Sequence, residues 1–231
     1  MLEIAQLSQS YGGGRTLWNV DLSIPDGSCV ALMGRNGVGK TTLVKCMMGL
    51  LALDGGTITF IDEDITRSPP DQRARRGIGY VPQGRMIFPL LSVKENLLVG
   101  LTARMDKSQT IPDHIFDLFP ILRDMLNRRG GDLSGGQQQQ LAIGRALAMD
   151  PKFLILDEPT EGIQPNIVHQ IGDVILQLNR ELGMTVLLVE QKLPFVRRVA
   201  SEFCLMEKGQ IVAAGEMAQL SDDLIGKHLA V

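Results

Sequence analysis

A glycine-rich segment that ends in lysine and threonine is the clearest candidate for chemistry in this sequence. Residues 34–41 read Gly-Arg-Asn-Gly-Val-Gly-Lys-Thr and match the pattern G-x-x-x-x-G-K-[ST]. Glycines let successive backbone N–H groups point into one concavity, and a following helix adds partial positive charge at its N-terminus. Lys40 would then reach the β- and γ-phosphates of a nucleotide, and the Thr41 hydroxyl would bind Mg²⁺. The predicted nucleotide-binding residues of this segment are Gly34, Arg35, Asn36, Gly37, Val38, Gly39, Lys40, Thr41 and Thr42.

Two adjacent carboxylates, Asp157 and Glu158, follow the apolar run Phe153–Leu156. An aspartate at the carboxyl end of a buried strand can hold Mg²⁺, and a neighbouring glutamate can orient or deprotonate an attacking water. Acidic residues also end strands as solvated turn residues. Together with a phosphate-binding segment, however, the pair favours nucleotide hydrolysis.

A second glycine turn, Leu-Ser-Gly-Gly-Gln at residues 133–137, precedes a predicted helix from Gln138 to Ala148. The backbone N–H groups at a helix start, with a serine hydroxyl as an additional donor, form a second candidate anion site. Taken alone, the same residues are also typical of an ordinary helix cap.

The elements that must position these motifs alternate between strand and helix. Buried strands are predicted at Cys29–Met33, Phe153–Leu156 and Thr185–Val189, with a helix from Lys40 to Met48 and a long helix spanning 167–182. This alternation predicts an α/β fold whose central strands are parallel. A hairpin is predicted around residues 207–210.

The first sixty residues instead predict antiparallel strands. Trp18, Val20, Leu22 and Ile24 alternate with polar residues and are predicted to form one buried face of a strand, and 57–61 predicts another.

Between about 83 and 131 the pattern changes to helix. A capping box, Ser92-x-x-Glu95, opens an apolar segment that runs through Leu101. We therefore expect one domain over 1–231, with a core at about 1–83 and 150–231 and a helical insertion at about 84–149 that carries residues 133–137.

Composition excludes several other classes of protein. The chain has 231 residues, with 23 Lys and Arg against 26 Asp and Glu, so its formal charge of −3 lacks the basic character of a nucleic-acid binder. No apolar run approaches the ~20 residues of a membrane span, and Met1-Leu2-Glu3 has no basic-then-apolar leader, so we expect no signal peptide. Other residues have structural interpretations: the three cysteines are expected to be reduced and buried, the three histidines lack metal-ligand spacing, and Arg73, Arg75 and Arg76 are expected on a solvated face.

The motifs occur in the order found in the ATP-binding subunits of ABC transporters, and the chain resembles that family from Leu2 to about Val212. The resemblance implies an ABC ATPase cassette, with a P-loop NTPase core, that hydrolyses ATP with Mg²⁺. It further implies a head-to-tail dimer, either a homodimer or a heterodimer. ATP would lie between the P-loop of one subunit, here residues 34–41, and the signature sequence of the other. The signature sequence comprises Ser134, Gly135, Gly136 and Gln137.

Individual roles are implied by the same resemblance. Glu158 and Gln191 would be catalytic, and Thr41, Gln83 and Asp157 would form the Mg²⁺ site. Tyr11 matches the aromatic residue that stacks on adenine, although it is also consistent with an ordinary tyrosine at a strand edge.

The implied partners are two integral-membrane permease subunits, with an external solute-binding protein acting indirectly and no nucleic acid. The chain would lie at the cytoplasmic face of a bacterial inner membrane. Among importers, the segments 128–132, 137–140 and 158–165 resemble urea-uptake ATPases more than those for branched-chain amino acids, which are the alternative. Two other functions are less consistent with the sequence: that of a soluble ABC-type ATPase and that of a non-hydrolytic nucleotide-binding regulatory module.

The chain departs from the family pattern at two places. Gln191 stands where the family has a switch histidine, and Glu161–Gln164 replaces the usual Ser-Ala-Leu-Asp. The first change concerns sensing of the γ-phosphate, and the second concerns communication across the dimer.

Overall fold

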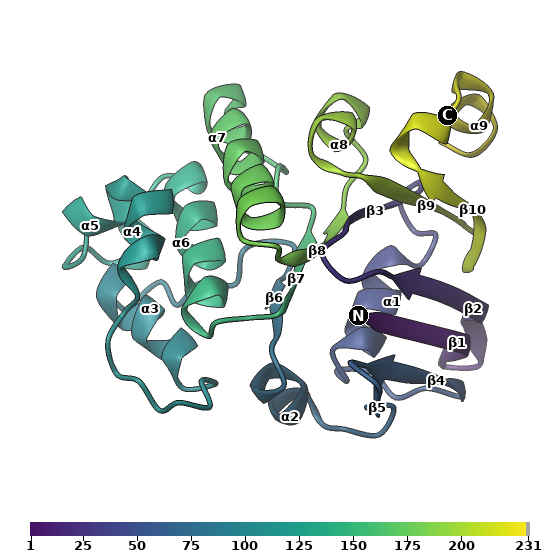
Figure 1. Cartoon of the computed structure of the whole chain (residues 1–231), viewed down its shortest axis with the longest axis horizontal. Helices are drawn as coiled ribbons and strands as arrows, with labels where there is room; N and C mark the ends of the chain where they lie inside the picture. The colour runs from purple at the N-terminus through teal and green to yellow at the C-terminus, as the bar shows by residue number, and fades with distance from the viewer. Residues whose placement is uncertain (230–231) are drawn as a thin grey trace.

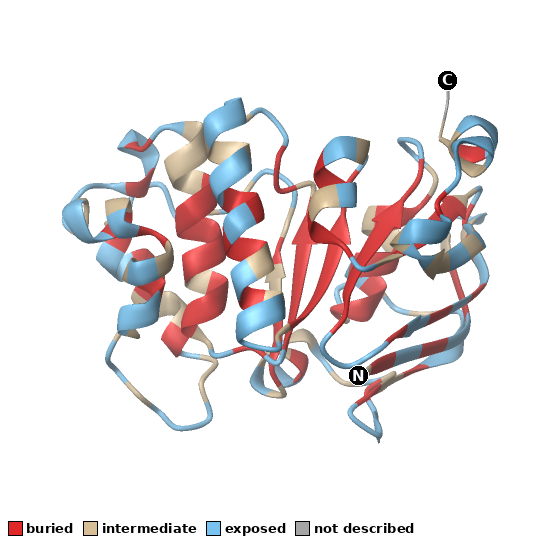
Figure 2. Ribbon diagram, turned by 45° about the horizontal axis from the view of Figure 1, so that its top comes forward, coloured by how far each residue is buried: buried red, intermediate tan, exposed pale blue. Residues whose placement is uncertain are grey.

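A six-stranded sheet forms the centre of the molecule in the computed structural model, which describes residues 1–229 (Figure 1). Its strand order is β10-β9-β3-β8-β7-β6, and all neighbours are parallel except β9 and β10. The strands are β3 (Cys29–Met33), β6 (Ile78–Val81), β7 (Phe153–Asp157), β8 (Thr185–Val189), β9 (Glu202–Glu207) and β10 (Gln210–Glu216). The residues of β3, β7 and β8 are all buried, because other layers cover both faces of the sheet (Figure 2). The three predicted buried strands are confirmed.

The N-terminal segment forms a second, antiparallel sheet of order β2-β1-β4-β5. Its strands are β1 (Leu2–Tyr11), β2 (Gly14–Ile24), β4 (Gly55–Phe60) and β5 (Glu63–Asp64). The alternation of buried and exposed residues along β1 and β2 is visible in Figure 2, because only one face of this sheet meets the core. The predicted fold class, with a mostly parallel sheet and antiparallel N-terminal strands, is confirmed.

One residue of the predicted buried face of β2 was assigned wrongly. Trp18 is 45% exposed, and Leu17 takes its place in the core. Asn19 has a φ of 45°, and the pairing with β1 shifts register between Leu7 and Gln9. Such an irregularity breaks the two-residue period, so side chains before it point to the opposite face.

Buried apolar side chains form two clusters, one on each side of the six-stranded sheet. One cluster lies between the two sheets and surrounds α1 (Lys40–Met47), the helix that follows the P-loop. The other cluster lies under the helices α3 (Val93–Leu101), α6 (Gly135–Ala148), α7 (Pro165–Leu176) and α8 (Leu193–Val199). The three cysteines are free and buried, as expected, and contribute to these clusters.

The helices between β6 and β7 occupy the left half of Figure 1 and include α6, which carries the signature sequence at its start. The remaining helices are α2 (Pro70–Arg75), α4 (Asp113–Leu118), α5 (Pro120–Asp124) and α9 (Asp222–His228), with short helical turns at Gly130–Asp132, Gln177–Glu181 and Met217–Gln219.

Two helix boundaries differ from the predictions, whereas the capping box of Ser92 and Glu95 is present as expected. The helix α6 begins at Gly135 and not at Gln138, because Ser134 is its N-cap and forms a capping box with Gln137. The predicted long helix over 167–182 is α7 followed by a π-helical turn at Gln177–Glu181.

The prediction for Arg73 is also wrong, because this residue is 2% exposed and does not lie on a solvated face. Its guanidinium donates to the carbonyls of Cys46 and Met47 at 2.9 and 2.7 Å, and to those of Ser68 and Thr66 at 2.9 and 3.0 Å. The carbonyls of Cys46 and Met47 belong to the C-terminal turn of α1, where the helix dipole favours a cation. Arg75, in contrast, is exposed as predicted.

Candidate functional site

Three motif loops leave the six-stranded sheet at the same edge. Leu32 of β3 and Asp157 of β7 both lie in register with Val189 of β8, the strand between them. The P-loop and Asp157-Glu158 therefore begin on opposite sides of the 190–192 segment, which follows β8. The carboxyl ends of parallel strands are where α/β sheets bind ligands, so the sheet brings together three segments that are far apart in the sequence.

The P-loop is shaped by contacts that require glycine. A Cβ at Gly34, where φ is +155°, would lie 2.4 Å from the carbonyl oxygen of Met206 in β9. At Gly39, where φ is +113°, a Cβ would lie 2.9 Å from Leu17 Cδ2. Both contacts press the loop onto neighbouring strands, and a larger residue at either position would displace it.

Lys40 is buried at the start of α1 and donates to the carbonyls of Gly34 at 2.7 Å and Arg35 at 3.0 Å. Burial lowers the pKa of its ammonium group, while the charges of Glu158 and Asp157 act in the opposite direction. The ammonium group thus lies over the loop that would cradle the phosphates. A phosphate would replace these carbonyls as its partner.

Asp157 fits a Mg²⁺ site. The side chain is 1% exposed, and neither carboxylate oxygen has a hydrogen bond of good geometry. Burial raises the pKa of Asp157 to about 6, whereas the nearby Thr41 hydroxyl lowers it and the charge of Glu158 raises it. Two unpartnered hard oxygens beside a threonine hydroxyl match the preference of Mg²⁺, which binds through one or two carboxylates and completes its shell with phosphate and water.

Glu158 is held by two glutamine amides. Gln83 Nε2 lies 3.0 Å from Glu158 Oε2, and Gln191 Nε2 lies 2.9 Å from Glu158 Oε1. The same Gln191 nitrogen lies 2.6 Å from Oδ1 of Asn36 in the P-loop. Glu158 has a φ of 49°, a left-handed conformation that is uncommon outside glycine. The candidate base is therefore half-buried, and residues from two other loops orient its carboxylate.

Glu190 and Thr160 also belong to the site, although neither was predicted from the sequence. Glu190 is 3% exposed, and its carboxylate accepts hydrogen bonds from the backbone N–H of Gln191 at 2.7 Å and from the Thr160 hydroxyl. Lys192 Nζ in turn donates to the carbonyl of Thr160 at 2.9 Å. A carboxylate at the end of a buried strand was the available signal. Glu190 fixes the loop that carries Gln191 against the segment that follows Glu158.

The signature residues lie apart from the P-loop, on α6 in the opposite half of the molecule (Figure 1). In residues 1–229, no hydrogen bond joins 34–42 to 134–137. Ser134 is exposed, its hydroxyl accepts from the N–H of Gln137 at 3.4 Å, and its own N–H donates to Gln137 Oε1 at 2.9 Å. Gly135 and Gly136 pack closely against neighbouring side chains. A Cβ at Gly135 would lie 3.2 Å from the guanidinium of Arg85, and a Cβ at Gly136 would lie 3.0 Å from Ile167. The two candidate anion sites of one chain therefore lie on separate elements in different halves of the molecule.

Two further predicted residues are accessible. Tyr11 is 47% exposed at the end of β1. Gln83 is exposed in the loop after β6, and its amide also donates to Glu161 Oε2 at 3.0 Å. This second contact was not expected, and it connects Gln83 to the segment that departs from the family pattern.

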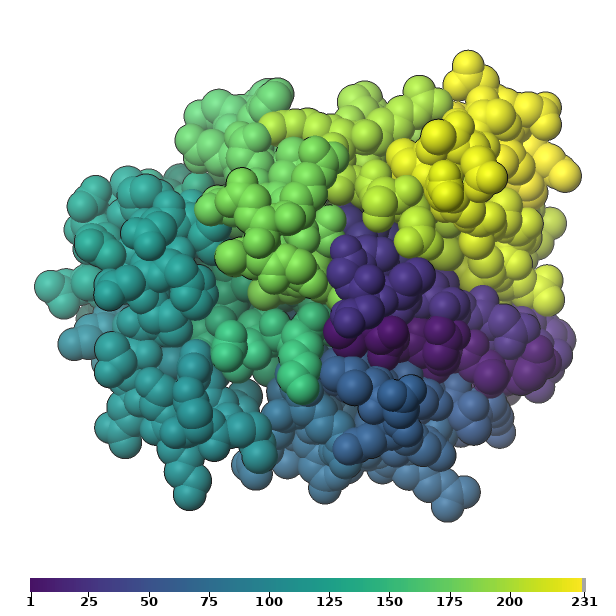
Figure 3. Space-filling view, viewed as in Figure 1, coloured from purple at the N-terminus to yellow at the C-terminus, as the bar shows by residue number. Residues whose placement is uncertain are grey.

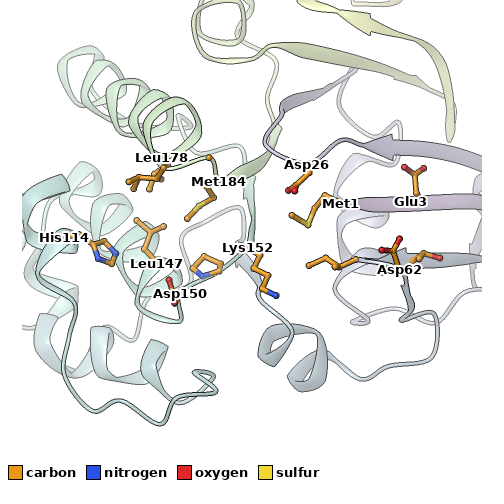
Figure 4. Close-up of a pocket in the computed structure, with 15 residues that line it drawn as sticks. Met1, Glu3, Asp26, Asp62, His114, Leu147, Asp150, Lys152, Leu178 and Met184 are labelled. Atoms are coloured by element: carbon orange, nitrogen blue, oxygen red, sulfur yellow. The ribbon is translucent and has the colours of Figure 1, made fainter.

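A cavity of about 850 Å³ lies away from these residues (Figure 4). Its lining includes Asp26, Lys152 and Met184, which precede β3, β7 and β8. It is therefore at the amino ends of the parallel strands, opposite the edge that carries the P-loop, and it takes no part in the candidate site.

Comparisons with known proteins show the family to which the chain belongs. Residues 17–161 match the ABC transporter family. The chain belongs to the ABC transporter family. It is 40% identical to BraG, a high-affinity branched-chain amino acid transport ATP-binding protein of Pseudomonas aeruginosa, over 92% of this chain and 91% of the relative. It is 35% identical to LivF, a probable branched-chain amino acid transport ATP-binding protein of Archaeoglobus fulgidus, over 95% and 94%. It is 36% identical to the lipopolysaccharide export ATP-binding protein LptB of Escherichia coli, over 96% and 93%.

Solved structures of ABC transporter cassettes share the whole fold. MJ1267, an ATP-binding cassette of an ABC transporter, is 30% identical with a TM-score of 0.84, over 98% of this chain and 97% of that one. MJ0796, solved as a dimer, is 25% identical with the same TM-score, over 94% and 99%. This ABC transporter subunit is an ATPase. Within the part of the chain that the structure describes, no helix has the length and apolarity to cross a membrane.

Proposed function

We propose that the chain hydrolyses ATP in sites shared between two subunits and thereby powers solute import. The observation that carries this proposal is the separation of the P-loop from Ser134 in one chain, because each bears half of a phosphate site. A head-to-tail partner would place its signature sequence over the P-loop. MJ0796, which shares the fold, was solved as a dimer.

The P-loop, Lys40 and the exposed Tyr11 would bind the triphosphate and the adenine, with Thr41, Asp157 and Gln83 around Mg²⁺. The Mg²⁺ ion, when bound, supplies charge that stabilises the transferring phosphoryl group. Glu158 would take a proton from water as the water oxygen attacks the γ-phosphorus, and ADP would leave. Gln191 would hold both Glu158 and the P-loop in position, because its amide already contacts Asn36 and Glu158.

Mixed dimers test the shared site. A dimer of one Lys40→Ala subunit and one Ser134→Arg subunit retains one complete site only if the P-loop and signature act across the interface. We expect about half of the wild-type ATPase activity from the purified mixed dimer, although each homodimer is inactive. Inactive mixed dimers, with their formation confirmed by two affinity tags, would contradict the proposal.

The coupling partners would be two permease subunits in the membrane. Large apolar side chains are exposed on both sides of α3: Met86 at 67%, Phe88 at 45%, Leu90 at 81% and Met105 at 74%. Exposed apolar side chains of this size are typical of protein contacts. Met86, Phe88 and Leu90 lie in the loop after β6 that also carries Gln83. Their exposure supports docking of the permeases on the helical half of the cassette at the cytoplasmic face of the membrane.

For the solute, the relatives support branched-chain amino acids more than the urea predicted from the sequence, since BraG and LivF carry that function in their names. No residue of this subunit would touch the solute. Deletion of the gene followed by uptake of labelled leucine and labelled urea tests both. We expect the loss of leucine uptake; a loss of urea uptake alone would restore the original prediction, and unchanged uptake of both would contradict an importer for either solute.

A further inference from the structure

Arg85 lies between the loop of Gln83 and the first turn of α6. Its Nη1 donates to Gln138 Oε1 in α6 at 3.4 Å, and its Nη2 donates to the carbonyl of Glu161 at 3.4 Å. The side chain is half-buried. One guanidinium thus contacts the signature helix and the segment that follows the candidate base.

The signature sequence fits closely onto this guanidinium. A Cβ at Gly135 would lie 3.2 Å from both Nη atoms of Arg85. The backbone of Gly135 is helical, a conformation that any residue adopts. The close approach of Arg85, and not the backbone conformation, therefore explains why this position lacks a side chain. The first turn of α6, Ser134 to Gln137, therefore rests on Arg85.

The backbone of Arg85 is also fixed to α6. Gly84, Arg85 and Met86 have φ values of 77°, 70° and 49°, a left-handed run that only the first residue adopts readily. Arg145 of α6 donates to the carbonyl of Arg85 at 3.4 Å and to that of Met86 at 2.8 Å. The side chain of Arg85 therefore contacts α6, and the backbone of its loop accepts hydrogen bonds from Arg145 of the same helix.

The charge of Arg85 is not balanced by a carboxylate. Among residues 1–229 it forms no ion pair, and both of its hydrogen bonds end on neutral oxygens. A cation near a helix N-terminus opposes the helix dipole, so the position does not stabilise α6 by itself. An anion at the exposed end of the same turn would compensate both the charge of the Arg85 guanidinium and the partial positive charge of the helix N-terminus.

We propose that Arg85 is a positioning residue for the ATP held by the partner subunit. It braces the turn that presents Ser134 and adds positive charge behind it. The proposal rests on the shared site described above. It goes beyond that site because it assigns a role in trans to a residue of the Gln83 loop.

Two mixed dimers place the same substitution on opposite sides of one working site. In the first, a Lys40→Ala subunit is joined to an Arg85→Gln subunit, so the altered subunit supplies the P-loop of the remaining site. In the second, a subunit carrying both Lys40→Ala and Arg85→Gln is joined to a wild-type subunit, so the altered subunit supplies the signature. The reference is a Lys40→Ala subunit joined to a wild-type subunit.

We expect the second dimer to lose about tenfold or more in kcat relative to the reference, with the KM for ATP changed less than about twofold. The first dimer should match the reference. A loss confined to the first dimer, equal losses in both or no loss in either would overturn the proposal. Because both dimers contain the same substituted arginine, a general folding defect would affect them equally.

Two controls separate this inference from its premise. If the Lys40→Ala and Ser134→Arg mixture is inactive, the shared site itself fails, and the trans role of Arg85 fails with it. A second readout is ATP-dependent dimerisation of Glu158→Gln protein: Arg85→Gln should weaken it, whereas Arg123→Gln, which alters a 55% exposed arginine paired with Asp113 in the same half of the cassette, should not. Arg85→Lys should recover only part of the loss, because an ammonium group cannot make both contacts of the planar fork.

Discussion

The side-chain amide of Gln191 bridges Oδ1 of Asn36 and Oε1 of Glu158, at 2.6 and 2.9 Å. It therefore connects the P-loop to the candidate base across the carboxyl edge of the sheet. An amide nitrogen donates without carrying a charge and does not titrate near neutral pH. Gln191 thus has the contacts of a residue that orients, and it lacks the chemistry of one that transfers protons.

Gln191→Ala should lower the ATPase rate by roughly 10- to 100-fold, since a hydrogen bond to a charged group contributes about 1.5–3 kcal/mol. Gln191→His should retain substantial activity and add a pH dependence between about pH 6 and 7. The measurements are steady-state ATPase rates and pH–rate profiles of the purified protein. Gln191→Glu is the matched control, because it keeps the shape but removes the donor and places a second carboxylate beside Glu158. An unchanged rate for Gln191→Ala would mean that this position has no part in hydrolysis.

Glu158→Gln should reduce turnover by about 10²–10⁴-fold while ATP still binds, because the amide keeps the shape and loses the base. One of the two contacts from Gln83 and Gln191 would also be lost, since an amide has a single acceptor oxygen. With ATP, the variant should accumulate as a dimer on size-exclusion chromatography. Near-wild-type hydrolysis would show that another group is the base.

Asp157→Asn should stabilise the nucleotide-free protein at pH 8 and change it little near pH 4. Burial raises the pKa of Asp157 from 3.8 to about 6, so between these values the folded protein keeps a proton that the unfolded chain has lost. The free energy of unfolding of the wild type therefore falls by roughly 1–3 kcal/mol as pH rises through this window. Asparagine does not ionise, so the variant does not undergo this decrease.

Thermal unfolding at both pH values measures this effect. Mg²⁺ with ATP should raise the melting temperature of the wild type at pH 8 and raise that of Asp157→Asn much less, because the amide is a poorer ligand for Mg²⁺. Equal stability of the two proteins at pH 8 would contradict the assigned cost of burying this carboxylate.

Arg73→Met should destabilise the protein by roughly 3–5 kcal/mol, because the carbonyls of Cys46, Met47, Ser68 and Thr66 would lose their buried partner. Arg75→Met, which alters an exposed arginine on the same helix, should stay within about 0.5 kcal/mol of the wild type. Urea unfolding of the two variants compares them directly. Equal midpoints would show that Arg73 does not hold the end of α1.

The sequence determined the local elements of this protein and the chemistry carried by contiguous motifs. The P-loop, the pair Asp157-Glu158 and the capped start of α6 each consist of neighbouring residues, so their pattern is fixed by backbone conformation and by hydrogen bonds over a few positions. The buried strands were readable for a similar reason, since a strand covered on both faces must be apolar at every position.

Only the tertiary structure decided which distant residues meet. Strand order and helix placement bring the amide of Gln191 to Asn36 and the amide of Gln83 to the carboxylates of Glu158 and Glu161. They also place the guanidinium of Arg85 behind Gly135. Arg73 and Trp18 were misassigned for the same reason. The carbonyls that make burial of an arginine favourable come from segments up to 27 residues away, and a single irregular residue in β2 reverses the side that a tryptophan faces. Local pattern cannot encode either effect, because both are set by what the rest of the chain places beside the residue.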